Sequence, residues 1–398
     1  MDDIQQILQS MMREAVSPTT AAVALAVIGL NIHFGYTGLL NIGQSAFMLL
    51  GAYGFAIMVD QGHSMWLGVV VGLLLAFVFA LVLGVPTLKL RGDYLAIVTI
   101  SAAEIVRYVG RSVGYEWLFK LTGGAQGIPG SHYRGPFSDL SFFPDGDTVL
   151  LSFNYQDVGG GSALVRLVGW VIVIALIWTA VRIARGRTSL AGAARAGTLA
   201  ALVVLTALVV FFLVPVGAQN TGVNGWCFTF VAWLLVGAGL VVVLGLTRSP
   251  WGRALRGVRE DEDAMRSLGK NVFAIKMQAL VIGGLFGAVG GMMYVLPTAV
   301  QPDALGRNMT FFCYTSLLLG GAATIWGPVL GSLIFWVGRI AIIGISNTYL
   351  SSDNYLNVMN GQQTSQFAFI VIGVALMLLV IFRPQGILGD KRELRFNV

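Results

Sequence analysis

Apolar runs of about 20 residues dominate the chain and alternate with short polar segments. A helix needs about 20 mostly apolar residues to cross the hydrocarbon core of a bilayer. The pattern therefore predicts an all-α polytopic membrane protein with about 11 transmembrane helices, within a range of about 8 to 11. The predicted spans lie near residues 18 to 34, 37 to 59, 65 to 86, 93 to 110, 164 to 184, 196 to 216, 226 to 246, 274 to 297, 306 to 324, 326 to 345 and 366 to 382.

The first two runs differ from plain transmembrane helices because glycines and polar residues interrupt them. Backbone that leaves the helix at membrane depth is tolerated where it is buried in protein or lines a cavity. We therefore expect glycine-broken helices in this part of the chain. The interrupting residues are Gly35, Tyr36, Thr37, Gly38, Asn41, Gly43 and Gln44.

The composition supports a membrane protein. Of the 398 residues, 56% are hydrophobic and 11% are charged, whereas about a quarter of the residues in a soluble domain are charged. Cys227 and Cys313 lie inside apolar runs, so they favour packing over a disulfide or a metal site. His33, His63 and His132 are isolated from other ligand types, and we expect no metal site.

The distribution of Lys and Arg predicts the orientation, because these residues are retained on the cytoplasmic side of the membrane. Four segments that alternation places on one side, together with Lys276 just after the third, hold 17 of the 25 basic residues. We therefore interpret the net charge of +6 as topology, and expect no nucleic acid partner. The cytoplasmic segments are those near residues 90 and 190, the loop 247–273 and the tail 383–398; the segments 1–17, 111–163 and 346–364 fall outside.

The loop 247–273 is the most highly charged segment between two spans. Five Arg, one Lys and four acidic residues lie between Arg248 and Lys270, so this segment does not enter lipid. Charged and apolar residues both recur at steps of three to four, which predicts one short amphipathic helix ended at Gly269. The charged positions are Arg253, Arg256 and Glu260, followed by Ala264, and the apolar positions are Ala254, Val258, Met265 and Leu268.

The end of this loop, DAMRSLG from Asp263 to Gly269, resembles the E-A-A-x-x-x-G loop of ABC importer permeases, with Asp in place of Glu and Met in place of the second Ala. In that family, a helix in the loop docks into a groove on an ATPase subunit. The resemblance implies that Arg259, Glu262, Asp263, Ala264 and Gly269 form the ATPase-coupling loop.

Several longer segments, in the same order along the chain, look like the M-type permease subunit of branched-chain amino acid ABC importers. The resemblance implies a heterodimer with a homologous H-type permease, two cytoplasmic ATPase subunits, and an extracytoplasmic binding protein that delivers leucine, isoleucine or valine. It also implies the bacterial plasma (inner) membrane. The segments are GYTGLLNIGQSAFMLLGAY, LKLRGDYLAIVTISAAEIVR, LTGGAQGIPG, SPWGRALRGVREDEDAMRSLGKNV, LLLGGAATIWGPVLG and IFRPQGILG.

The region between Gly130 and Trp226 departs from this family, which usually has one loop and fewer spans there. We interpret residues 164–216 as a two-helix insertion within a single transmembrane domain, 18–398. Two added spans preserve the orientation of everything downstream. The sequence leaves open whether the insertion faces lipid or contacts a partner.

Ionisable groups inside spans are candidates for function, because they are expensive to bury in a membrane. Glu104 and Arg107 stand three residues apart, so they share a helix face and can pair with each other; they form either a structural ion pair or a substrate contact. We expect Arg339 either to extend to a membrane–water interface or to contact Glu104. Glycine-rich segments that break helices offer further candidate walls of a translocation pathway; these are Thr122, Gly123 and Gly124, and Gly320 and Gly321.

The sequence contains no G-x-x-x-x-G-K-[ST] motif, so we expect no cofactor bound by this chain and assign ATP to the partner subunits. The chain is then a translocating subunit and not an enzyme. One alternative is an ABC permease for urea, short amides or simple sugars. Another, from a different class, is an ion-coupled secondary transporter.

Overall fold

The computed structural model describes residues 2–88, 92–111, 116–138, 176, 178–179, 226–350, 361–382 and 385–389. The chain divides into two compact units, Met1–Leu140 with Cys227–Val398, and Ser141–Trp226. Of the second unit, only residues 176, 178, 179 and 226 are described, and all four are helical. The predicted spans at 164–184 and 196–216 otherwise lie outside the described residues, as do the whole segment 139–163 and the end of the tail.

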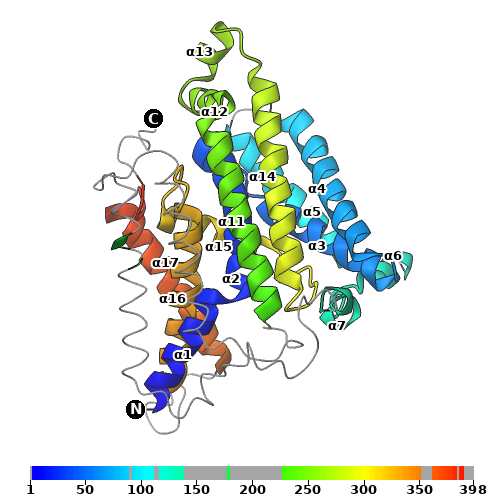
Figure 1. Cartoon of the computed structure of the whole chain (residues 1–398), viewed down its shortest axis with the longest axis vertical. Coiled ribbons are helices and arrows are strands. Elements are labelled where there is room, and N and C mark those ends of the chain that lie inside the picture. The colour runs from blue at the N-terminus through cyan, green and yellow to red at the C-terminus, as the bar shows by residue number, and fades with distance from the viewer. Residues whose placement is uncertain are drawn as a thin grey trace. The chain divides into compact units, whose positions relative to one another are not determined.

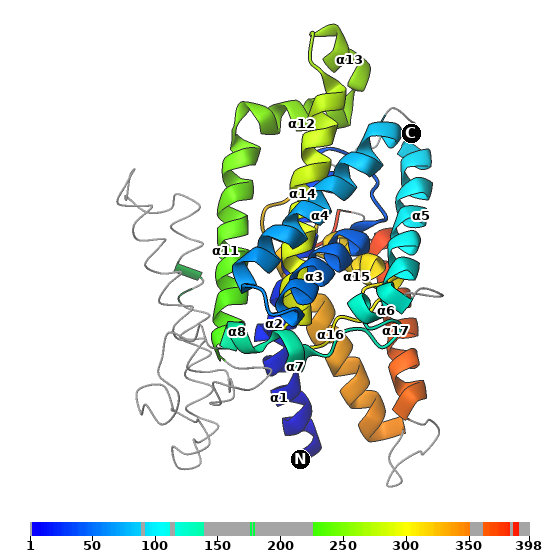
Figure 2. The same cartoon turned by 90° about the vertical axis from the view of Figure 1, so that its right-hand side faces the viewer.

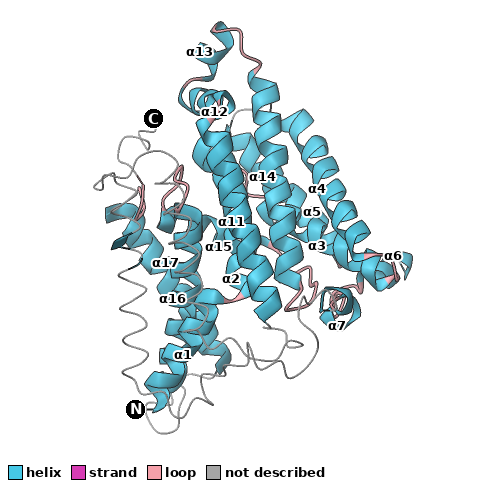
Figure 3. Ribbon diagram, viewed as in Figure 1, coloured by secondary structure: helices cyan, strands magenta, loops and turns pink. Residues whose placement is uncertain are grey.

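Helices account for almost all of the regular structure in the described part of the first unit, which holds no strand beyond an isolated bridge between Ile128 and Val300 (Figure 3). The helices before residue 140 are α1 (Asp2–Val16), α2 (Pro18–Leu30), the π-helix η1 (Asn31–Tyr36), α3 (Gln44–Asp60), α4 (Met65–Thr87), α5 (Gly92–Gly110), α6 (Glu116–Thr122), α7 (Gly130–Tyr133) and α8 (Gly135–Ser138). The later helices are α11 (Trp226–Arg248), α12 (Pro250–Glu260), α13 (Glu262–Ser267), α14 (Val272–Val295), α15 (Arg307–Gly320), α16 (Gly327–Leu350) and α17 (Gly361–Phe382).

Among the described residues, five helical segments are long and apolar enough to cross a membrane: Pro18–Tyr36, Met65–Thr87, Phe228–Arg248, Val272–Val295 and Gly327–Tyr349. Each coincides with a predicted span. The spans predicted near 37 to 59, 93 to 110, 306 to 324 and 366 to 382 are also helical, as α3, α5, α15 and α17. The prediction of an all-α, multi-pass membrane protein is therefore confirmed.

Two segments that were predicted only as stretches outside the membrane also form helices. The N-terminal segment 1–17 forms the helix α1, which packs against α16. The segment 111–163 contains the short helices α6, α7 and α8. Within the first unit, α12 and α13 lie at one end of the helix bundle, and α7 and α8 lie toward the other end (Figure 1 and Figure 2).

The core is built where α2, α3 and α4 pack against α14. These helices approach closely because small residues line their contacts. A Cβ atom added at Gly51 would clash with the backbone of Ala288, and one added at Gly291 would clash with the backbone of Met48. The tight packing expected for the glycines of α14 is therefore present.

Gly291→Val should destabilise the fold, because a side chain there must push the backbone of α3 away from α14. Overpacking of this kind costs about 1–3 kcal/mol, occasionally more. The matched control is Gly237→Val on α11, where an added Cβ meets nothing within 4 Å. Thermal unfolding of the two purified variants should show a clear loss of melting temperature for Gly291→Val alone; equal melting temperatures would contradict the packing argument.

Candidate functional site

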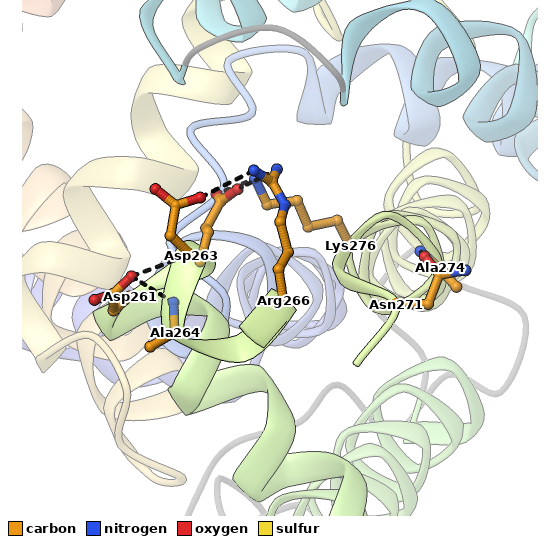
Figure 4. Close-up of polar contacts among 8 residues, drawn as sticks. Asp261, Asp263, Ala264, Arg266, Asn271, Ala274 and Lys276 are labelled. Carbon is orange, nitrogen blue, oxygen red and sulfur yellow. Dashed lines mark hydrogen bonds and ion pairs between the residues drawn. The ribbon is translucent and has the colours of Figure 1, made fainter. Parts of the chain in front are cut away.

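The charged loop folds as a hairpin of two short helices, α12 and α13. Ser249 caps α12 by accepting a hydrogen bond from the Gly252 amide, and Leu255 and Val258 bury the inner face of that helix. At Asp261 the backbone becomes extended, and the Asp261 carboxylate accepts hydrogen bonds from the amides of Asp263 and Ala264 at 2.9 and 3.0 Å (Figure 4). Asp261 is therefore the N-cap of a second helix.

The prediction of one continuous amphipathic helix through this loop is thus wrong, although its predicted end is correct. An Asp side chain satisfies free amides at a helix start better than it supports a helix interior, so the chain breaks at Asp261. The amide of Gly269 donates to the carbonyl of Arg266, and the amide of Lys270 donates to that of Met265. With Gly269 at φ +73°, these two bonds form a Schellman cap.

The side chains of α13 divide into an anchored side and an exposed side. Glu262 pairs with Lys276 of α14 and with Arg266, and Lys276 itself is buried. Asp263 pairs with Arg266 at 3.0 Å, and both basic side chains point toward the acidic start of α13 (Figure 4). Ala264 and Gly269 are exposed, and Leu268 is 73% exposed. The tip of the hairpin is held firmly and presents a small, partly apolar surface.

Arg259 connects the hairpin to the membrane-embedded part of the chain. Its guanidinium Nη1 donates a hydrogen bond to the carbonyl of Gly35 at 2.5 Å, and α12 packs against η1. Gly38 also lies against Arg259, because a Cβ built at Gly38 would meet the Cγ of Arg259 at 3.2 Å. Arg259, which the sequence predicted to dock on the ATPase subunit, therefore points instead toward the broken helix.

The predicted helix break is present between α2 and α3. The α-helix gives way to the π-helix η1 at Asn31, the chain leaves the helix at Thr37, and α3 starts at Gln44. π-helical turns are rare and are frequent at functional sites. The polar side chains of this region are buried, which requires hydrogen bonds for all of them.

His33 and Asn41 form the centre of this buried polar network. His33 Nε2 lies 3.1 Å from the carbonyl of Leu280, which can only accept, so Nε2 carries the proton. His33 Nδ1 then accepts from Asn41 Nδ2 at 3.1 Å. The Asn41 carbonyl oxygen Oδ1 accepts from the Gly43 amide, and Gln44 Nε2 donates to the carbonyl of Ala26. His33 is therefore a structural hydrogen-bonding residue.

Side chains from distant helices complete the network. Thr99 of α5 accepts from the Ile42 amide, Thr310 of α15 accepts from the Ser45 amide, and Tyr314 donates to the carbonyl of Asn41. Asn31 binds the turn between α15 and α16, through the amide of Ala323 and the carbonyl of Thr324. The break is thus joined to α5 and to α15 with its following turn, which are far from it in sequence.

A second polar cluster surrounds the predicted pair Glu104 and Arg107. The pair is present, with Nη2 of Arg107 at 2.8 Å from Oε2 of Glu104. Arg107 also binds Asp303, and Arg307 binds the other oxygen of Glu104 at 2.9 Å. Glu104 therefore already has two Arg partners, and Arg339 lies elsewhere, over the rings of Trp336 and Phe369.

The glycine-rich candidates occupy two separate places. Thr122, Gly123 and Gly124 end α6, and this turn packs next to the Ile128–Val300 bridge, where Gly127 lies against the carbonyl of Val300. Gly320 and Gly321 end α15, and their turn is covered by residues 385–389, since Leu388 donates to the carbonyl of Gly320.

Gly320 and Gly321 are not close to the Glu104 cluster. Arg307, which binds Glu104, begins α15, and Gly320 ends it. A rise of 1.5 Å per residue separates these positions by about 20 Å. The structure therefore does not bring the predicted pathway residues together into one site.

Sequence reasoning missed the long-range partners in each cluster. Asp303 and Arg307 carry no local signal, because they meet Glu104 and Arg107 only through the packing of α5 and α15. Lys276 could have been suspected, since it is a basic residue within a predicted span. No group of three or more His, Cys, Asp or Glu side chains within the described ranges could hold a metal ion.

Comparison with known proteins adds independent information. A family model for the permease component of branched-chain amino acid transport systems matches residues 14–381. The chain is 26% identical to the high-affinity branched-chain amino acid transport system permease protein LivM of Escherichia coli strain K12 over 380 residues, which is 95% of this chain and 70% of that protein. No solved structure matched significantly.

Shorter matches include a second type of permease protein. A probable LivM protein of Methanocaldococcus jannaschii is 27% identical over 173 residues, which is 42% of this chain and 48% of that protein. The permease protein LivH of Salmonella typhimurium is 30% identical over 164 residues, which is 41% of this chain and 46% of that protein. The chain is thus similar to both kinds of permease protein, with the longest of these matches to LivM.

His33→Phe should destabilise the protein, because it leaves the Leu280 carbonyl and the Asn41 amide without their partner in a buried region. An unsatisfied buried polar group costs about 1–3 kcal/mol. The control is His63→Phe, since His63 is exposed. Melting temperatures of the two variants should differ, with His33→Phe lower. An unchanged melting temperature for His33→Phe would mean that the network does not hold the helix break.

Proposed function

This chain belongs to the family of permease components of branched-chain amino acid transport systems, and from this premise we propose that it is a permease subunit of an ABC importer. The proposed substrates are leucine, isoleucine and valine, delivered by an extracytoplasmic binding protein. The chain translocates and does not itself hydrolyse ATP. The named function of its relatives supports the proposal.

The observation that carries the proposal is the direct contact between the exposed hairpin and the broken helix. The tip of the hairpin has a capped, rigid geometry and an exposed surface at Ala264, Leu268 and Gly269. Its base binds the Gly35 carbonyl through Arg259. A device that receives force from a cytoplasmic ATPase needs both features, a stiff contact surface and a connection to the transport pathway.

We assign two roles within the predicted coupling residues. Asp263, Ala264 and Gly269 contact the ATPase subunit, because they are exposed at the tip. Arg259 and Glu262 transmit its motion, because they bind η1 and α14 respectively. Binding of ATP by the partner ATPases favours one state of the permease and hydrolysis resets it, since each ligand shifts the equilibrium toward the state that it binds better.

The proposed assembly contains a homologous H-type permease, two cytoplasmic ATPase subunits, the binding protein and membrane lipid. The similarity of this chain to both LivM and LivH supports pairing of two related permeases. We propose about 11 spans in the bacterial inner membrane, with the hairpin and the C-terminus in the cytoplasm, which the clustering of Lys and Arg favours. No cofactor is assigned to this chain.

On this topology, the two groups of candidate pathway residues serve the two ends of the pathway. Glu104, Arg107, Thr122, Gly123 and Gly124 belong to the outer end. Gly320 and Gly321 belong to the inner half, because their turn is bound to Asn31 of η1, next to the hairpin. The ion pairs of Glu104 and Arg107 with Asp303 and Arg307 then hold α5 and α15 together at the outer end.

Gly269→Trp should abolish ATP-driven uptake of radiolabelled leucine into proteoliposomes that hold the co-purified complex and its binding protein. The substitution forces a side chain into the left-handed conformation at the hairpin tip (φ +73°) and adds bulk to the ATPase contact. Gly62→Trp is the matched control, because Gly62 also has positive φ (+80°) and open space around its Cβ.

The two variants separate coupling from backbone strain. We expect Gly62→Trp to retain uptake and both variants to retain the permease heterodimer, with loss of the ATPase subunit from Gly269→Trp alone. Equal loss of uptake in both variants would favour strain over coupling. Leucine entry without ATP or any ATPase would replace the importer with a secondary transporter, and uptake of urea, amides or sugars in place of leucine would reassign the substrate.

Arg259→Gln should keep the ATPase subunit bound but lower the amount of leucine transported per ATP hydrolysed, because it weakens the connection to Gly35 and not the exposed tip. A charged hydrogen bond of this kind contributes about 1.5–3 kcal/mol. Arg253→Gln is the control, because Arg253 lies on the exposed face of the same helix. If Arg259→Gln instead releases the ATPase, Arg259 is a docking residue and does not transmit motion.

A further inference from the structure

Three buried side-chain polar atoms in the described part of the chain have no hydrogen-bond partner, namely Ser316 Oγ, Trp336 Nε1 and Arg339 Nε. Trp336 and Arg339 stand three residues apart on α16, so they share one face of that helix. Trp336 Nε1 and Arg339 Nε are both N–H donors. Buried donors without acceptors are rare in native proteins, and two on one helix face need an explanation.

The surroundings of Arg339 are aromatic. Its guanidinium carbon lies 5.2 Å from the ring centroid of Trp336 and 5.7 Å from that of Phe369. Phe312 and Phe335 pack against the same rings, with Phe312 stacked on Phe369 at 5.6 Å and Phe335 at 5.8 Å from Trp336. Ring faces favour a cation over them but supply no acceptor in the plane of the guanidinium. The cluster thus combines an apolar wall with two unsatisfied donors.

A carboxylate approaches this cluster from another helix. Glu14 lies near the end of α1, which packs against α16. Burial raises the pKa of the Glu14 carboxyl, whereas the Arg339 guanidinium and a hydrogen bond with the Ser17 side chain act in the opposite direction. The packing of α1 on α16 brings Glu14 to the side of Arg339, and no direct ion pair joins the two among the described residues. A cationic donor and an anionic acceptor face one region from two helices.

The position of the cluster along the bundle follows from its place on α16. This helix begins at Gly327, which lies against Gly321 in the turn bound to η1. Arg339 stands 12 residues further along α16, about 18 Å from that end. The cluster therefore lies away from this inner turn, toward the side where substrate arrives on the proposed topology.

We propose that Trp336, Arg339 and Glu14 bind the backbone groups of the amino acid substrate, an inference that rests on the proposed function and names its recognition site. The substrate carboxylate accepts hydrogen bonds from Trp336 Nε1 and Arg339 Nε, and its ammonium group donates to the Glu14 carboxylate. The branched aliphatic side chain packs against the rings of Phe312 and Phe369. A zwitterion satisfies both charges at once, which neither a simple anion nor a cation does.

Trp336→Phe tests the proposal, because it removes the unsatisfied N–H donor and keeps most of the ring. A purely structural Trp336 gains from this change, since an unsatisfied buried donor disappears. We expect the melting temperature to stay equal or rise, while binding of radiolabelled leucine to the complex in nanodiscs, without the binding protein, weakens roughly tenfold. Trp66→Phe is the control, because Trp66 is exposed on α4.

Other outcomes separate this site from the proposed function. ATP-driven leucine uptake by the wild-type complex tests the importer by itself. If that uptake is present but leucine binding is absent in the wild type, or is unchanged by Trp336→Phe, the site is wrong and the importer stands. Native mass spectrometry covers a further possibility: a phospholipid retained by the wild type and lost from Arg339→Gln, with leucine binding unchanged, would assign the donors to a lipid headgroup and overturn the proposal.

Discussion

The structure depends on one constraint, that backbone amides and carbonyls freed by breaking a helix inside a membrane must find partners within the protein. Between Leu30 and Gln44, the chain gives up regular helical hydrogen bonds, and side chains replace them. Asn41 serves its own loop, while Thr99 and Thr310 each accept from a loop or helix-start amide. Because these side chains come from α5 and α15, those two helices must sit at the break. The positions of the surrounding helices therefore follow from the hydrogen bonds that the break requires.

Close packing and the break have opposite mechanical consequences. Where α14 meets α2 and α3, glycines bring backbones into direct contact, so this part of the bundle can move only as a unit. The π-helical segment η1 lies at the boundary of that unit and receives Arg259 from the hairpin at Gly35. Force applied at the hairpin thus enters the bundle where its regular helical bonding is weakest. This arrangement supports a rigid-body change pivoting at the break more than a uniform deformation.

The sequence predicted those features that depend on local patterns. Long spans follow from the thickness of the bilayer, and the break follows from glycines placed among Thr37, Asn41 and Gln44. Features that depend on tertiary contacts could not be predicted from the sequence in the same way. The inward direction of Arg259 and the pairing of Glu104 with Arg307 join segments more than 200 residues apart. The helix break at Asp261 was predictable only in part. An acidic run such as residues 260–263 is compatible with a helix interior or with an N-cap, and the two hydrogen bonds accepted by the Asp261 carboxylate show that Asp261 is an N-cap.

The two buried polar regions differ in a way that bears on function. At the break, His33, Asn41 and Gln44 use almost every donor and acceptor, which is what stability alone requires. On α16, Trp336 and Arg339 keep donors without acceptors, although replacing either by an apolar residue would remove the penalty. The buried polar groups at the helix break are almost all hydrogen-bonded, so the lack of partners on α16 is not a general feature of this protein. The unsatisfied donors of α16 are therefore better explained by a ligand than by imperfect packing, because proteins depart from local rules chiefly at functional sites.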